Sequence, residues 1–149
     1  MEKSETIEVL NTLIEINNDR IQGYKTAAKE TKQTDLKNLF SEFENISLEC
    51  RAHLMKEVEK RNGEVANGTT ASGKVFRVWM DLKSAVTGNN RKAILNSCQY
   101  GEEASQRTYS DVLDNHKAEL DPEIKRLIFG QKAILGSNLF TIKGLLEIL

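Results

Sequence analysis

Apolar side chains recur at spacings of three, four and seven residues along nearly the whole chain, and this periodicity constrains the fold more than any other feature. Such spacing places apolar residues on one face of an α-helix. Near the N-terminus the apolar stripe consists of Leu10, Ile14, Ile21, Tyr24 and Ala28. The 149 residues include a single proline, so few positions interrupt a helix. The sequence therefore predicts an all-α protein.

Start and stop signals divide this pattern into four long helices and one short helix. Asp121 followed by Pro122 is the strongest start signal, because aspartate favours the N-cap and proline the first helical position. Asn62 followed by Gly63 is suited to a left-handed helix end, and Asn89 or Asn90 can cap the third long helix. The expected helices span about 5–31, 35–62, 74–86, 90–116 and 122–149.

The lengths of the connections predict how these helices are arranged. Short connections near 32–34 and 117–121 join antiparallel neighbours. The linker from Gly63 to Asn89 contains the short helix and could span the length of the bundle. The sequence therefore predicts one domain over residues 1–149, a ferritin-like four-helix bundle. Two antiparallel hairpins are joined by one long crossover that carries the extra helix.

Charge and composition exclude several classes of function. Lys plus Arg (21) nearly cancels Asp plus Glu (22), which argues against nucleic-acid binding and against an anionic membrane surface. The N-terminus lacks the apolar run of a signal peptide, so we expect a cytoplasmic protein. The last helix is the most apolar, but its charges argue against a membrane span. Cys50 and Cys98 lie in different helices and are expected to be reduced, packed thiols, with a disulfide as the alternative.

Three segments resemble a known family. They are the run Ile16-Asn17-Asn18-Asp19-Arg20-Ile21-Gln22-Gly23-Tyr24, the block Trp79-Met80-Asp81-Leu82-Lys83, and the Gly101-Glu102 pair that precedes Tyr109. These segments are similar to those of a bacterial ferritin-like family of unknown function, and the similarity extends over nearly the whole chain. The resemblance implies a ferritin-like bundle in a bacterial protein and brings no established activity with it.

Ferritin-like metal proteins hold two metals with one Glu from each of two helices and a Glu-x-x-His motif from each of the other two. Four carboxylates offset the charge of two hard cations, and two imidazoles fix the geometry. The inward positions that correspond here are Asn17, Cys50 with His53, Glu102, and Gln131 with Asn138. One carboxylate and one imidazole cannot hold a metal pair, so the resemblance implies a degenerate metal site.

Two hypotheses remain for the residues of this centre. Cys50, His53 and Glu102 could supply sulfur, nitrogen and oxygen to one zinc ion, or Cys50 is a core residue and His53 lies at the edge of the stripe. An inward Glu102 needs a partner or a proton, because an unpaired buried charge is costly; otherwise it faces solvent beside Glu103. The expected partners of Glu102 in a polar core layer are His53, Asn17, Tyr24 and Asn138, and Gln131 is a further polar candidate.

No complete catalytic constellation can be assembled, which favours a protein that is not an enzyme and that carries no cofactor. The leading hypothesis is a structural, interaction or stress-related accessory role. The alternatives are a redox protein that depends on iron or zinc, and a binder of small ligands in the bundle core. The apolar last helix is either a central core helix or one whose second face is covered by another subunit; a homodimer, if it forms, is expected to use residues 122–149 or the crossover helix 74–86.

Overall fold

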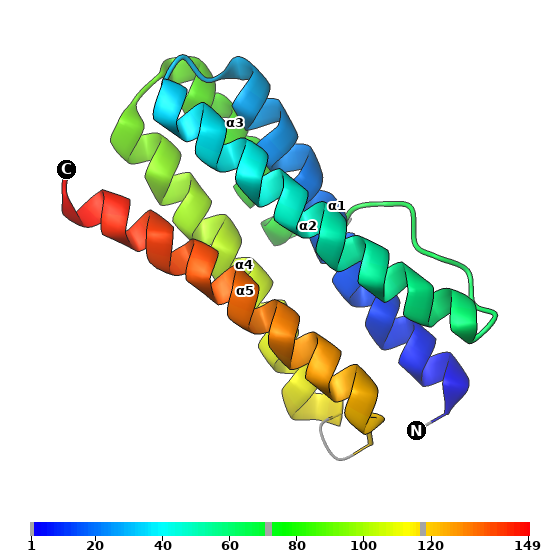
Figure 1. Cartoon of the computed structure of the whole chain (residues 1–149). Helices are drawn as coiled ribbons and strands as arrows, with labels where there is room; N and C mark the ends of the chain where they lie inside the picture. Colours follow the sequence, from blue (N-terminus) through cyan, green and yellow to red (C-terminus); the bar gives the residue numbers. More distant parts are fainter. Residues whose placement is uncertain (1, 71–72, 117–118) are drawn as a thin grey trace.

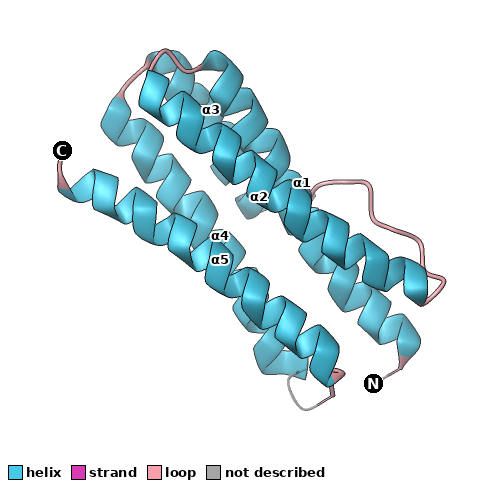
Figure 2. Ribbon diagram, viewed as in Figure 1, coloured by secondary structure: helices cyan, strands magenta, loops and turns pink. Residues whose placement is uncertain are grey.

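The computed structural model describes residues 2–70, 73–116 and 119–149, with the backbone alone for 73–76. Within these residues the chain forms five α-helices and no strand (Figure 2). The helices are α1 (Lys3–Glu30), α2 (Thr34–Lys60), α3 (Gly73–Gly88), α4 (Arg91–His116) and α5 (Pro122–Glu147). The predicted all-α fold is confirmed, and each helix begins and ends close to its expected positions. Residues 117 and 118 of the predicted second connection lie outside the described residues.

The four long helices form two antiparallel hairpins, α1 with α2 and α4 with α5 (Figure 1). Helices α2 and α4 run in the same direction, so one long crossover joins the hairpins. This crossover first returns along α1 and then continues as α3, which packs against α1 and α4. None of the described helices is both long enough and apolar enough to cross a membrane.

Local signals account for where the helices begin and end. Asn62 adopts a left-handed conformation with φ 57°, and the N–H of Gly63 donates to the Val58 carbonyl at 3.0 Å, which closes α2 as predicted. Asn90 caps α4 by accepting a hydrogen bond of 3.0 Å from the N–H of Ala93. Helix α5 begins at Pro122 as predicted, although the Asp121 side chain makes no capping hydrogen bond within the described residues.

The core consists of two hydrophobic clusters separated by polar side chains. One cluster lies between the first half of α1, the second halves of α2 and α4, and the first half of α5. The other surrounds Tyr24, Phe40, Phe43 and Trp79 at the opposite end of the bundle. The buried polar layer between them contains Asn17, Arg20, Ser47, Glu102, Gln131 and Asn138.

Trp79 joins α3 to the bundle by occupying a space between α1 and α4. Its ring packs edge-on against Tyr24, with ring centroids 5.2 Å apart. A Cβ atom at Gly101 would lie 2.9 Å from Trp79 Cη2, and one at Gly23 would overlap Cε3 of the same ring. The two glycines therefore provide the room that the indole ring occupies.

The part of the crossover that precedes α3 is bound to α1 by polar side chains. Asn11 donates to the Glu64 carbonyl and accepts from the Ala66 N–H, both at 2.9 Å. Asn18 donates to the Gly68 carbonyl at 2.8 Å. Further along, Asp19 accepts hydrogen bonds from both the N–H and the hydroxyl of Thr70. Burial raises the pKa of Asp19 to about 6, and the bonds from Thr70 only partly offset this effect.

Replacing Gly101 with alanine should destabilise the fold by about 1–3 kcal/mol, because the added methyl group meets the Trp79 ring. Gly88→Ala at the end of α3 is the matched control, since a Cβ at that helical position meets no neighbouring side chain or helix within 4 Å among the described residues. There alanine should be neutral or stabilise by up to about 1 kcal/mol. Urea unfolding of both variants provides the test, and a Gly101→Ala protein as stable as Gly88→Ala would contradict the packing described for Trp79.

The raised pKa of Asp19 predicts a specific dependence of stability on pH. Because the folded state binds this proton more tightly than the unfolded state, the contribution of Asp19 to the free energy of unfolding decreases as pH rises from about 4 to about 6. An asparagine side chain at this position does not ionise, and its amide can still bond Thr70 through both of its polar atoms. The Asp19→Asn variant should therefore match the wild type near pH 4 and exceed it by about 1–2 kcal/mol near pH 7.

Unfolding curves measured across this pH range test the prediction. The same substitution at exposed Asp111 controls for the loss of a surface charge. If the difference between wild type and Asp19→Asn does not change with pH, the Asp19 carboxylate is not buried in the way described.

Candidate functional site

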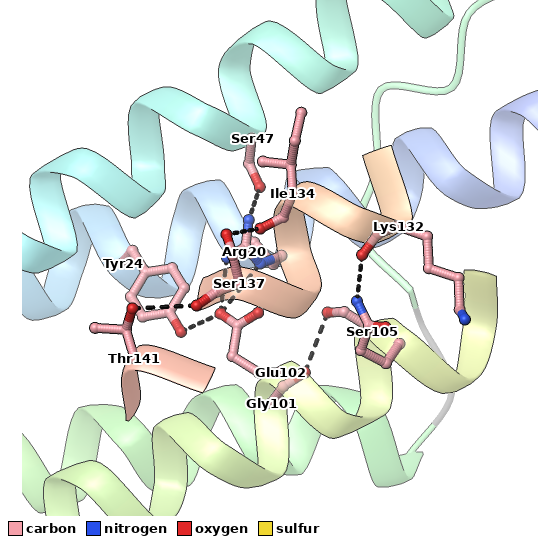
Figure 3. Close-up of polar contacts among 11 residues, drawn as sticks. Arg20, Tyr24, Ser47, Gly101, Glu102, Ser105, Lys132, Ile134, Ser137 and Thr141 are labelled. Atoms are coloured by element: carbon pink, nitrogen blue, oxygen red, sulfur yellow. Dashed lines mark hydrogen bonds and ion pairs between the residues drawn. The ribbon is translucent and has the colours of Figure 1, made fainter. Parts of the chain in front are cut away.

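The centre of the polar layer is an ion pair between Arg20 of α1 and Glu102 of α4, and both side chains are 0% exposed. The Arg20 Nη2 and Nε atoms donate to Glu102 Oε2 at 2.7 and 3.3 Å. Tyr24 donates its hydroxyl hydrogen to the same oxygen, and Ser47 accepts a hydrogen bond from Arg20 Nη1. Figure 3 shows these side chains converging from α1, α2 and α4. The charges are therefore paired with each other and with neutral hydroxyl groups.

The surroundings keep Arg20 charged and Tyr24 neutral. Burial disfavours the charged guanidinium, but Glu102 more than compensates and raises the pKa of Arg20 above its ordinary value. Burial and the Glu102 charge together raise the pKa of Tyr24 well above that of a free tyrosine. The Arg20 guanidinium carbon also lies 5.3 Å from the Tyr24 ring centroid and 5.9 Å from that of Phe43. Aromatic faces thus add to the stabilisation of the buried cation.

A second set of hydrogen bonds connects the four long helices beside this pair. Asn17 of α1 donates to the Tyr109 hydroxyl of α4 at 2.9 Å. Tyr109 donates to Gln131 Oε1 of α5 at 2.7 Å, and Gln131 Nε2 donates to the Cys50 carbonyl of α2 at 3.0 Å. Burial raises the pKa of Tyr109. The chain of bonds runs through neutral groups and links both hairpins.

The structure separates the three residues of the zinc hypothesis. Cys50 and Glu102 are buried, whereas His53 is exposed on the surface of α2. Burial raises the pKa of the Cys50 thiol to about 11, although the metal-binding form of cysteine is the thiolate. Among the described residues, no group of three or more His, Cys, Asp and Glu side chains is placed to hold a metal ion.

The donor atoms of the polar layer also do not fit a pair of metals. Glu102 Oε2 already accepts hydrogen bonds from Arg20 and Tyr24. Glu102 Oε1 and Asn17 Oδ1 are buried oxygens without a hydrogen-bond partner in the described part of the chain. One carboxylate oxygen and one amide oxygen beside a guanidinium cannot offset the charge of two divalent cations.

Cys98 and Asn138 are two further buried side chains at the centre. Both cysteines are free thiols, and burial, with Glu102 nearby, raises the pKa of Cys98 well above its usual value. Asn138 is buried, and its Nδ2 atom has no hydrogen-bond partner among the residues described. These groups place no reactive nucleophile at the centre.

A small cavity of about 120 Å³ lies outside the bundle centre, between α1, α3 and the crossover. Asp19, Gly23, Thr69, Trp79 and Lys83 are among its lining residues. The hypothesis of small-ligand binding predicted a cavity in the bundle core. The lining of this cavity does not include the predicted Asn17, Tyr24, Gln131 or Asn138, so small-ligand binding in the bundle core stays a prediction.

Arg20 is the residue of the polar layer that the sequence interpretation missed. Of the expected partners of Glu102, Tyr24 contacts it, while Asn17 bonds Tyr109 and His53 faces solvent. Arg20 follows Asn17 by three residues and precedes Tyr24 by four, so it shares their inward helical face. This spacing is the sequence signal that places Arg20 in the core.

Comparison with known proteins gives the family of the chain. Residues 5–115 match the model of a family described as a domain of unknown function (DUF2383). No curated protein matches the chain. The matched residues contain Arg20, Tyr24, Ser47 and Glu102, whereas α5 lies beyond them. Because the match covers more than half of its length, the chain belongs to the DUF2383 family, whose function is unknown.

Proposed function

We propose that this protein is a ferritin-like bundle that acts through association with protein partners and not through metal catalysis. The order of its long helices, two antiparallel hairpins joined by one long crossover, supports a ferritin-like fold. In this proposal the Arg20–Glu102 pair occupies the region where such bundles hold their metals. The protein then has a structural, interaction or stress-related accessory role, with a degenerate metal site.

The buried contact between Arg20 and Glu102 is the observation that carries this proposal. A metal bound to Glu102 would compete with the guanidinium for the single carboxylate of the layer. Displacement would leave the fully buried Arg20 without its counter-ion, which is strongly unfavourable. An internal cation thus takes the electrostatic role that a metal takes in functional relatives of the fold.

The protonation states of the neighbouring groups support a role without catalysis. General bases and nucleophiles have pKa values near the working pH, or lowered ones. Here the pKa values of Tyr24, Cys50, Cys98 and Tyr109 are raised by burial, so all four side chains stay protonated at neutral pH.

We also propose that the protein is bacterial and cytoplasmic. The resemblance of its Ile16–Tyr24 run to a bacterial family supports the first part. Two free, buried cysteines support the second, since thiols persist in reducing compartments.

Metal binding gives the sharpest test. Protein purified without a histidine tag, incubated with Fe²⁺, Mn²⁺ or Zn²⁺ and then desalted should retain only traces of metal, because Arg20 already neutralises Glu102. Elemental analysis of the wild type, Glu102→Gln and His53→Ala should give the same low value. Glu103→Gln, a change in the neighbouring and less buried carboxylate, is the matched control.

Stoichiometric metal that survives in Glu103→Gln and disappears in Glu102→Gln or His53→Ala would overturn the proposal in favour of an iron- or zinc-dependent protein. His53 is exposed, so its substitution leaves the fold intact even if Glu102→Gln is unstable. Circular dichroism of each variant separates loss of metal from loss of structure.

A further inference from the structure

Helix α5 is apolar on two opposite faces. Its inner face contributes Ile124, Ile128, Leu135 and Ile142 to the core. On its outer side Phe129 is 45% exposed, Ile134 47% and Phe140 79%. Between Leu127 and Ile142 the only charged residue is the half-buried Lys132. An exposed apolar face of this kind marks an interaction surface.

The outer face has a regular sequence pattern. Arg126, Ala133, Phe140 and Glu147 recur every seven residues, which is close to two helical turns, so they form one row along the helix. Phe129 and Gly144 lie three residues inside the two ends of this row. When two copies of this row are placed side by side in opposite directions, each cation lies opposite an anion. Each aromatic side chain then lies opposite a small residue.

We infer that this outer face binds α5 of a second copy of the chain in antiparallel orientation, about a two-fold axis between Gly136 and Ser137. This inference rests on the proposed function, association with protein partners, and identifies one such partner as a second copy of the chain. In this arrangement Phe140 faces Ala133 of the second copy and Phe129 faces its Gly144, while Arg126 faces its Glu147. Because the contact is isologous, each pairing occurs twice.

The charges at the two ends of the outer face favour a second copy of the chain as the partner, in antiparallel orientation. Arg126 and Glu147 are exposed, and neither forms an ion pair within the described part of the chain. They lie about 31 Å apart along one helix, so they cannot pair within one molecule. Parallel helices would instead bring Arg126 against Arg126 and Glu147 against Glu147. Only the antiparallel arrangement brings opposite charges together at both ends.

The glycines of α5 fit the same interface. Among the described residues, no neighbouring side chain or helix lies within 4 Å of a Cβ built at Gly130 or Gly144, so the packing described does not require glycine at either position. A helical glycine is less favourable than alanine. At the proposed interface, these two positions let the partner helix approach closely. The crossover helix is the poorer candidate, because its exposed Met80 lies beside the charged and exposed Arg77, Asp81 and Lys83.

Sedimentation velocity of the whole chain from about 1 to about 100 µM tests this inference. The wild type should shift from monomer to dimer as its concentration rises. Arg126→Glu and Glu147→Arg should each weaken dimerisation roughly tenfold or more, because each places like charges together twice. The double variant Arg126→Glu/Glu147→Arg restores both opposite pairs and should return the dissociation constant to within about threefold of the wild type. Phe140→Glu should abolish the dimer, and Arg77→Glu on α3 is the charge-reversal control.

A protein that is monomeric throughout this range overturns the inference, as does a dimer that Phe140→Glu and Arg126→Glu leave unchanged. Single variants that weaken association without rescue in the double variant exclude the antiparallel arrangement. Metal analysis of the same samples distinguishes failure of the dimer proposal from failure of the proposal that the bundle holds no metal. A monomer without metal contradicts only the dimer, and a dimer with stoichiometric metal contradicts only the metal-free bundle.

Discussion

The fold depends on burying a positive and a negative charge at its centre. Removing Arg20 and Glu102 from water costs several kcal/mol per ion, which is recovered only through close pairing and further hydrogen bonds. The pair meets this condition, because Tyr24 and Ser47 occupy additional bonding positions and two aromatic rings flank the guanidinium. Arg20 and Glu102 belong to different hairpins, so the contact that pairs their charges also links the two hairpins. The hydrophobic clusters on either side exclude water from it.

The centre of the bundle and the outer side of α5 differ in chemical character. The tyrosines and thiols of the polar layer are protonated, and the carboxylate is already neutralised by an arginine. The layer therefore joins the long helices through one ion pair and a set of hydrogen bonds. On the outer side of α5, by contrast, large apolar side chains remain in contact with solvent. In our proposal the centre has a structural role and α5, which lies beyond the residues that match the family, mediates association.

Much of the fold could be predicted from the sequence because helix periodicity and end signals are local. Asn62, Asn90 and Pro122 lie at helix ends that were predicted from the sequence. The lengths of the connections predicted which helices form hairpins. The partner of Glu102 is 82 residues away, and no local pattern encodes such a contact. Hydropathy alone assigns arginine to the surface, so Arg20 was missed despite its inward position. His53 immediately precedes Leu54, which lies in the middle of the buried stripe of α2, and one residue turns a helix by about 100°, so His53 faces solvent.

A double-mutant cycle on Arg20 and Glu102 tests the central claim most directly. Arg20→Met and Glu102→Gln should each lower the free energy of unfolding by about 3–5 kcal/mol, because each leaves the other group buried without its partner. If the two groups interact as described, the double variant should lose about 1–3 kcal/mol less than the sum of the two single losses. Losses that add to within about 0.5 kcal/mol would show that the two groups do not interact, and would contradict it.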